Sequence, residues 1–314
     1  MNDGFNQGNI LLEQSERWIE DYKNKSSSSL FDWNTASIEE YRDMPLDTLL
    51  HDDYFLGLKG KLYEGVYQDL VDLWGEKKKR EINAAFFLEA IGAGKSFKAS
   101  IILWLLWYEL SMNVNPQAKY GLAPDSVMAI MLMSRSATQS KRVVFGYTWD
   151  RFQSGFNKDY FPVNPRYSSE IRIDRNRTCV YAGTSSALSA LGYNLFSAVI
   201  DEANFLEVTE DSNKAEGEMY DAGEEMFNAI MNRMTSRFMV HGKIPGIIIS
   251  ISSPRYPDSF MERKIKEIKA IGEVIMKAFW RQRSLWEAKG PSYFDMTKYF
   301  IIDTETLEIL DEVK

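Results

Sequence analysis

Residues 86–100 read FFLEAIGAGKSFKAS, and the fold depends on the triplet Gly94-Lys95-Ser96 within them. An apolar run precedes this triplet and a helix-like segment follows it, which is the setting of a phosphate-binding loop between a strand and a helix. The standard Walker A pattern, G-x-x-x-x-G-K-[ST], has a glycine five residues before Gly94, but Glu89 stands there. The stretch is therefore either a degenerate nucleotide site or a chance Gly-Lys-Ser at the start of a helix.

Phosphate binding demands less than the full pattern. Backbone N–H groups must converge on the phosphates at a helix N-terminus, a lysine must reach the β and γ oxygens, and a hydroxyl must bind Mg²⁺. The candidate ATP-binding residues that supply these groups are Ile91, Gly92, Ala93, Gly94, Lys95 and Ser96. Glu89 affects only the exit of the chain from the strand, so the rest of the sequence has to decide.

Apolar strands and helices alternate outward from this loop. The predicted strands are 82–91, 127–134, 179–182, 195–201 and 246–252, and the predicted helices include 95–112, 136–154 and 221–238. Nearly continuous apolar strands separated by helices indicate an α/β fold with a mainly parallel sheet covered on both faces. We predict a P-loop NTPase core over residues 53–260, an N-terminal helical arm or lid at 1–52, and a C-terminal extension at 261–314.

Composition limits the functional class. The chain has 314 residues, 45% of them hydrophobic, so it can bury a large core. Its longest apolar segment, 101–110, is shorter than the roughly 20 residues that span a bilayer. Cys179 is the only cysteine, and no secretory signal begins the chain, which favours a reducing, cytoplasmic compartment. The net charge of -8 means that any contact with DNA must be local or shared among several copies.

The segment LFSAVIDEANFLE, residues 195–207, contains a second element of the site. Asp201 and Glu202 are adjacent carboxylates at the C-terminal end of a predicted strand, where ligands bind in open parallel sheets. In a Walker B element the first carboxylate holds Mg²⁺, and the second orients and deprotonates the attacking water. Many buried strands end in an acidic turn, but together with Gly94-Lys95-Ser96 this pair predicts an ATP site of the ASCE type.

A third element ends the predicted strand in GIIISISSP, residues 246–254. Ser252 and Ser253 could hydrogen-bond the γ-phosphate or the catalytic glutamate, and so respond to hydrolysis. The alternative is that Ser-Ser-Pro merely ends the strand.

These motifs resemble the ATPase domain of the large terminase subunit of tailed bacteriophages, over about residues 55–260. The matching blocks are EAIGAGKS, MSRSATQSKRVVF, GTSSALSALGYNLFSAVIDEANF and ISSP. The third is the most specific, because such enzymes carry a serine-bearing stretch and a glycine, here Ser186 to Gly192, before the Walker B strand. They also tolerate loops without the first glycine. The roles that the resemblance implies are phosphate and Mg²⁺ binding by Lys95 and Ser96, Mg²⁺ binding by Asp201, catalysis by Glu202, and coupling by Ser252 and Ser253.

The resemblance also implies adenine contacts and an arginine finger. The segment LYEGVYQDL would contact adenine through Tyr67 and Gln68. The alternative is that the segment is simply an amphipathic helix. Many large terminases carry an arginine in the Walker A loop, and residues 89–93 contain none. The arginine that stabilises the transferring phosphoryl group must then come from elsewhere, in cis or in trans. Arg135 is our candidate, and the alternatives are Arg142, Arg233 and Arg237.

The implied function is ATP- and Mg²⁺-dependent translocation of double-stranded DNA into a procapsid, in the cytoplasm of an infected bacterial host. Its partners would be the portal protein, the small terminase subunit and further copies in a homo-oligomeric ring, with no membrane involved. Full-length large terminases also carry a nuclease domain, which cannot fit after residue 260, although Asp303 and Glu305 imitate an acidic strand. The alternatives are another P-loop DNA translocase or helicase, or a non-catalytic nucleotide-binding switch.

Overall fold

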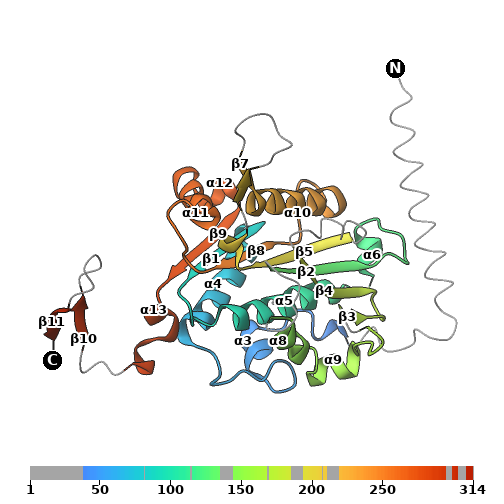
Figure 1. The fold of residues 1–314 in the computed structure, drawn as a ribbon. Helices are drawn as coiled ribbons and strands as arrows, with labels where there is room; N and C mark the ends of the chain where they lie inside the picture. Colours follow the sequence, from blue (N-terminus) through green and yellow to red (C-terminus); the bar gives the residue numbers. More distant parts are fainter. Residues whose placement is uncertain are drawn as a thin grey trace.

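A seven-stranded sheet forms the centre of the molecule (Figure 1), in the order β3-β4-β2-β5-β8-β1-β9. The computed structural model describes residues 38–80, 82–113, 115–134, 144–167, 170–184, 194–206, 208–210, 219–294, 299–302 and 309–313. The strands of this sheet are β1 (Ala84–Glu89), β2 (Met128–Ser134), β3 (Glu170–Ile173), β4 (Thr178–Thr184), β5 (Asn194–Asp201), β8 (Ile248–Ser252) and β9 (Ala278–Arg283). All neighbouring strands are parallel except β3 and β4, which confirms the predicted mainly parallel sheet.

Helices cover both faces of the sheet (Figure 1). One face carries α3 (Leu46–His51), α4 (Glu64–Arg80), α5 (Lys95–Ser111), α8 (Val144–Arg151) and α9 (Gly155–Tyr160), and the other carries α10 (Ala222–Phe238), α11 (Phe260–Ile271) and α12 (Glu273–Met276). Strand β1 shows how the two cores divide, because successive side chains point to opposite faces. Ala85 and Phe87 join the core under α4 and α5, whereas Phe86 and Leu88 join the core under α10 and α11.

Helix α5 is buried on nearly all sides, which explains the apolar run over residues 101–108. Its two indoles are fully buried, and each donates a hydrogen bond: Trp104 to Asn157 at 2.8 Å and Trp107 to Thr178 at 2.9 Å. Such bonds remove the cost of burying an indole N–H. Within the described ranges, no helix is both long and apolar enough to cross a bilayer.

The remaining elements are short. They are α6 (Pro116–Lys119), η2 (Ala203–Phe205), α13 (Leu285–Lys289), η3 (Pro291–Tyr293), and two antiparallel pairs formed by β6 (Val208–Glu210) with β7 (Met219–Asp221) and β10 (Tyr299–Ile302) with β11 (Ile309–Val313).

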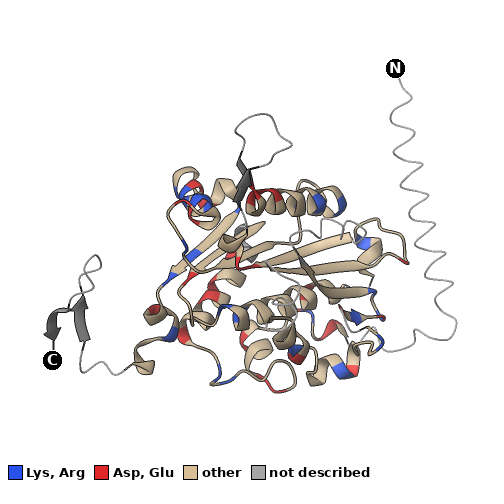
Figure 2. Ribbon diagram, in the orientation of Figure 1, with Lys and Arg blue, Asp and Glu red and all other residues tan. Residues whose placement is uncertain are grey.

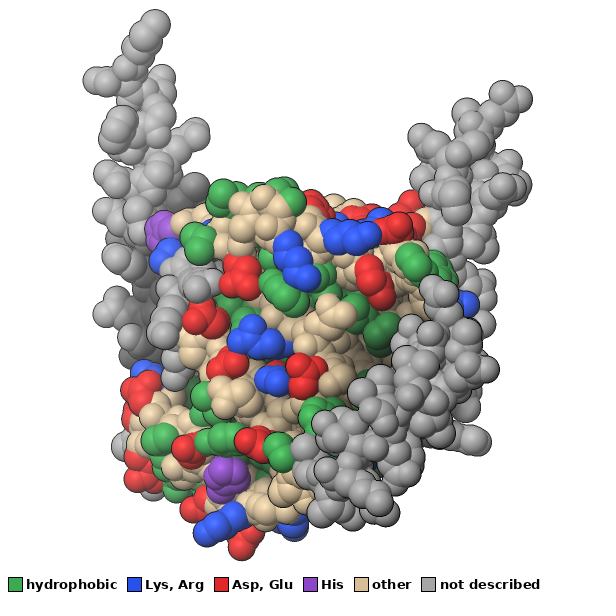
Figure 3. Space-filling view, turned by 90° about the vertical axis from the view of Figure 1, so that its left-hand side faces the viewer, with side chains coloured by type: hydrophobic (Ala, Val, Ile, Leu, Met, Phe, Trp, Pro, Cys, Tyr) green, Lys and Arg blue, Asp and Glu red, His purple; other side chains and the backbone are tan. Residues whose placement is uncertain are grey.

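The charged residues of α10 follow the helix dipole. Helix α10 has Glu224 and Glu225 in its first turn and Arg237 in its last (Figure 2), as the macrodipole favours. On the face drawn in Figure 3, basic and acidic side chains are interspersed, with hydrophobic ones between them.

The sheet extends beyond the predicted limits of the core. Strand β9 pairs in parallel with β1 although it follows residue 260, and Leu49 and Leu50 of the predicted N-terminal arm lie in the main core. Both segments are short and mixed in polarity, so their sequences do not indicate core. Strand β9 is an edge strand, so it lacks the continuous apolar run of a central strand. The predicted helix 136–154 is helical over 144–151, and residues 136–143 lie outside the described ranges.

Candidate nucleotide site

The candidate site lies at the carboxyl ends of three adjacent strands, β5, β8 and β1. Strand β8 lies between the other two, and the register pairs Leu88 with Ser252 and Asp201 with Ile251. The ends of β1 and β5 are therefore one strand apart. This spacing brings the phosphate loop after β1 and the carboxylates after β5 to the same edge, where parallel sheets bind ligands.

The loop between β1 and α5 turns on two glycines. Gly92 and Gly94 both adopt positive φ, 82° and 84°, a conformation that other residues rarely take. Gly94 is the N-cap of α5, so the first N–H groups of a 17-residue helix point out of the loop. Such a helix start is a favourable site for anions. Ile91 is 81% exposed at the tip of the loop, and Ser96 is half-buried.

Lys95 is buried beneath this loop. Its ammonium donates hydrogen bonds to the carbonyl oxygens of Ala90 at 2.8 Å and Glu89 at 3.2 Å. Burial lowers the pKa of Lys95, and the negative charges of Glu202, Glu89 and Asp201 act in the opposite direction. The lysine therefore lies in the field of both carboxylates at the end of β5.

The carboxylates of Asp201 and Glu202 lie at the end of β5, and one buried Asp201 oxygen has no hydrogen-bond partner among the described residues. This oxygen is Oδ1, and Asp201 as a whole is 5% exposed. Burial, followed by the charge of Glu202, raises the pKa of Asp201 to about 7. Glu202 has φ 58° and ψ 40°, a left-handed conformation that a glutamate adopts only when its surroundings enforce it.

These groups fit Mg²⁺, which prefers oxygen ligands. Ser134 ends β2, the strand next to β5, and its hydroxyl is also buried and unpartnered within the described part of the chain. Asp201 and Ser96 would hold the ion, directly or through water, and Ser134 lies on the adjoining strand end. Sequence reasoning missed Ser134 because a serine that ends an apolar strand carries no signal by itself.

Ser252 and Ser253 are buried, and they hold the loop that follows Glu202. The Ser252 hydroxyl accepts a hydrogen bond from the Asn204 N–H at 3.0 Å, and the Asn204 side chain donates to the Ser253 carbonyl at 3.0 Å. Ser252 thus contacts the main chain of Asn204, and Ser253 contacts its side chain, two residues beyond Glu202. This connection is compatible with the predicted coupling role, which remains a prediction.

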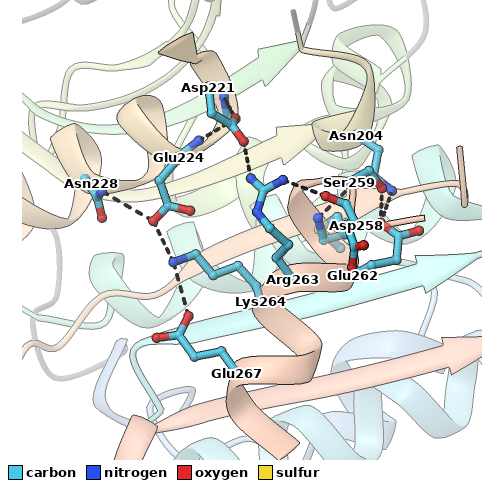
Figure 4. Close-up of polar contacts among 12 residues, drawn as sticks. Asn204, Asp221, Glu224, Asn228, Asp258, Ser259, Glu262, Arg263, Lys264 and Glu267 are labelled. Carbon is cyan, nitrogen blue, oxygen red and sulfur yellow. Dashed lines mark hydrogen bonds and ion pairs between the residues drawn. The ribbon is translucent and has the colours of Figure 1, made fainter. Parts of the chain in front are cut away.

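Asn204 was missed by sequence reasoning, although it stands within the quoted IDEANF. Its side chain also donates to Glu262 at 3.2 Å and accepts from the Met261 N–H at 2.8 Å, so it joins the loop after β5 to α11 (Figure 4). A polar amide two residues after the adjacent carboxylates Asp201 and Glu202 was the available signal.

Helix α11 is in turn tied to α10 (Figure 4). Lys264 binds Glu224 at 2.6 Å, and Arg263 binds Asp221, the N-cap of α10. Polar contacts therefore join the loop after β5 to α11 through Asn204, and α11 to α10 through Arg263 and Lys264.

Glu89, the departure from the Walker A pattern, belongs to a buried charge cluster. Lys98 donates to both Glu89 and Asp69, at 2.8 Å for Asp69, and Arg283 donates to Asp69 at 2.8 Å. Burial raises the pKa of Glu89 against the attraction of Lys98. For Asp69, burial acts upward, but the charge and hydrogen bond of Lys98 prevail and lower the pKa. The cluster joins β1, α4, α5 and β9 directly behind the phosphate loop.

Tyr67 and Gln68 have partners along and beside α4. The Tyr67 hydroxyl donates to Asp47 at 2.6 Å, and the Gln68 amide donates to Asp72 at 2.7 Å, one turn away. These are the contacts of an amphipathic helix, and the adenine role of both residues remains a prediction. The side chains of this region that approach the loop at Gly94 are those of Tyr63 and Val66.

Several predicted residues lie outside the described ranges: Arg135, Arg142, the stretch Ser186 to Gly192, Asp303 and Glu305. The two other arginine candidates, Arg233 and Arg237, both lie on α10.

The fold and the site define a P-loop NTPase domain of the ASCE type. A phosphate loop follows β1, an acidic pair lies at the end of β5, and one strand separates β1 from β5. The chain belongs to the family described as "Uncharacterized protein MJ0330, N-terminal P-loop domain", whose model matches residues 22–309.

Solved structures similar to this chain include phage packaging proteins. The large terminase from a thermophilic bacteriophage, in complex with ADP, is 10% identical, with a TM-score of 0.46 over 74% of this chain and 48% of that one. The HK97 bacteriophage large terminase is 13% identical, with a TM-score of 0.44 over 69% and 37%. The N-terminal domain of the DNA packaging ATPase from bacteriophage phi29 is 18% identical, with a TM-score of 0.33 over 59% and 76%.

Likeness at this level establishes no shared activity. The match spans less than half of each of these two large terminase chains. A search among curated proteins found no match.

Proposed function

We propose that this chain is an ATP-hydrolysing motor domain of the large-terminase type, which moves double-stranded DNA into a procapsid. The observation that carries the hydrolytic part is the acidic pair at the end of β5, one strand from the phosphate loop. A nucleotide-binding switch needs Asp201 for Mg²⁺, but it has no need of a second carboxylate beside it. Glu202, held in a left-handed turn at that position, favours an enzyme.

Binding of the triphosphate would use the loop and the start of α5. The N–H groups between Gly92 and Ser96 would surround the phosphates, and Lys95 would exchange its two carbonyl partners for β and γ oxygens. Asp201 and Ser96 would hold Mg²⁺, which neutralises charge on the phosphates when bound. Ionisation of Asp201 is then favoured, because a nearby cation offsets the burial that raises its pKa.

Hydrolysis would depend on Glu202. Its carboxylate would orient a water in line with the γ-phosphorus and take one proton as the new P–O bond forms and the bond to the β-phosphate oxygen breaks. A conformational change on hydrolysis would be transmitted through the loop after Glu202, because Asn204 fixes that loop to Ser252 and to α11. A shift of the loop would therefore be transmitted to α11 and α10.

The packaging part of the proposal rests on the motif order in the sequence. Ser-Ser at the end of β8 and the serine-bearing stretch before β5 are features of large terminases. The expected partners are double-stranded DNA, a portal protein, a small terminase subunit and further copies in a ring, within the cytoplasm of an infected bacterium. A ring would also supply the arginine finger in trans, and Arg135 is the candidate in this chain.

The test is ATP hydrolysis measured with and without double-stranded DNA, for the wild type and Lys95→Ala. We expect Mg²⁺-dependent phosphate release that DNA increases, and loss of both nucleotide binding and release in Lys95→Ala. Lys119→Ala, on the short helix α6, is a control for loss of a lysine elsewhere. Hydrolysis without any response to duplex DNA would contradict the DNA motor, and tight ATP binding without turnover would favour the switch.

A further inference from the structure

The last helix beside the phosphate loop carries an aromatic surface that the proposed phosphate chemistry does not use. Residues 284–294, here termed the C-terminal strap, contain α13 and η3 and follow β9 directly. In the sequence they fall in the expected C-terminal extension, yet α13 packs on the start of α4 beside the loop (Figure 1).

The strap is fixed closely against the loop and α4. The Leu285 side chain lies 3.5 Å from the position that a Cβ would take on Gly92 of the phosphate loop. On Gly65 of α4, a Cβ would meet the carbonyl oxygen of Glu287 at 2.6 Å and the Cα of Ala288 at 2.7 Å. Only glycine permits this approach. The Ser284–Glu287 capping box fixes the start of α13.

Two tyrosines and a lysine form the surface itself. Tyr63, which precedes α4, lies 3.3 Å from the Cβ position of Gly94, and its ring centroid is 5.7 Å from that of Tyr293 on the strap. Lys289 places its ammonium 3.8 Å from the Tyr293 centroid and 5.4 Å from the Tyr63 centroid. Tyr293 is 56% exposed, so one large aromatic side chain remains open to solvent beside the loop.

We propose that Tyr293, with Tyr63 and Lys289, forms the subsite for the base of the bound nucleotide, so that the C-terminal strap is part of the nucleotide site. The subsite rests on the proposed nucleotide binding. A base attached to a triphosphate in the loop is held within reach of Tyr63, because Tyr63 touches the Gly94 region. An exposed tyrosine face stacks on any base, and the larger face of a purine gains more than that of a pyrimidine. Lys289 places a cation beside the Tyr293 ring on which the base would stack.

The test compares ATP with tripolyphosphate, a probe that lacks the base, by titration calorimetry. Tyr293→Ala should weaken ATP binding by about 5- to 150-fold, the range of one lost base-to-aromatic stack, and leave tripolyphosphate binding unchanged. Tyr293→Phe keeps the ring and should bind ATP as the wild type does. The loss in Tyr293→Ala should be smaller for CTP than for ATP.

Trp286→Ala is the matched control, because Trp286 is an exposed aromatic residue of the same strap whose ring stacks on Phe294 at 4.7 Å. Unchanged ATP affinity in Tyr293→Ala would overturn the subsite, and so would equal losses for ATP and tripolyphosphate, which would indicate damage to the loop. A wild type that binds neither probe would instead refute the proposed nucleotide function itself.

Discussion

Replacing Glu89 by glycine creates the complete Walker A pattern, and the structure predicts that this change damages the protein. Glu89 and Asp69 supply two negative charges to the buried cluster, and Lys98 and Arg283 supply two positive ones. Without Glu89 the cluster keeps one uncompensated positive charge. The side chains of Lys98 and Asp69 are 0% exposed, so water cannot replace the lost partner.

The expected loss of stability is about 3–4 kcal/mol, the sum of two contributions. Removing one partner of a buried ion pair costs about 3–5 kcal/mol, and the lower end applies because Lys98 keeps Asp69. Glycine in a central strand weakens it by up to about 1 kcal/mol more. Hydrolysis should also fall, because glycine loosens the main chain at residue 89, whose carbonyl is one of the two acceptors that position Lys95.

Urea denaturation followed by circular dichroism measures the effect as a change in the free energy of unfolding. Two further variants separate charge from shape. Glu89→Gln keeps the volume and should cost less than Glu89→Gly. The double variant Glu89→Leu with Lys98→Met removes both partners, and should recover much of the loss because apolar residues of similar volume can replace a buried pair. A Glu89→Gly protein as stable and active as the wild type would refute the assigned role of the cluster.

Three other predictions concern the site and its supports. With a metal chelator present, the free energy of unfolding of the wild type should fall by about 2–3 kcal/mol relative to that of Asp201→Asn as the pH rises from 5 to 8. The reason is that Asp201 keeps its proton until near pH 7 in the folded protein, whereas the unfolded chain releases it near pH 4. Equal pH profiles in chemical denaturation would contradict this. Asn204→Ala should leave ATP affinity within about threefold but lower turnover at least tenfold, since its three side-chain hydrogen bonds position the loop after Glu202; a change in affinity alone would exclude a positioning role. Gly65→Ala should destabilise the protein by about 1–3 kcal/mol, because the new Cβ would overlap backbone atoms of α13; thermal unfolding at wild-type temperature would show that α13 is not fixed there.

The central strands could be predicted because a strand buried on both faces has a continuous run of apolar residues. Strands β1, β2, β5 and β8 are buried along almost their whole length and read as continuous apolar runs. Strand β9 could not be found in this way. Its polar positions include Arg281 and Arg283, whose acidic partners on α4 lie more than 200 residues earlier.

In the candidate site, too, residues in local motifs could be predicted, whereas residues that come together only in the fold could not. Lys95, Asp201 and Glu202 were predicted because each belongs to a local pattern with a fixed spacing. The partners of Glu89 belong to no local pattern, since Asp69, Lys98 and Arg283 come together only in the fold. Tyr293 was missed for the same reason, because its position beside the loop depends on the pairing of β9 with β1.

The most direct test of the central claim is phosphate release by Glu202→Gln compared with the wild type under saturating Mg²⁺ and ATP. Glutamine keeps the shape of the side chain but cannot accept the proton from water. We expect the wild type to release phosphate and Glu202→Gln to release it about 10²- to 10⁴-fold more slowly. The ATP affinity of the two proteins, measured by calorimetry, should be the same. Equal phosphate release by the two proteins would contradict the assignment of Glu202 as the catalytic base, and with it the proposal that β5 is the catalytic strand.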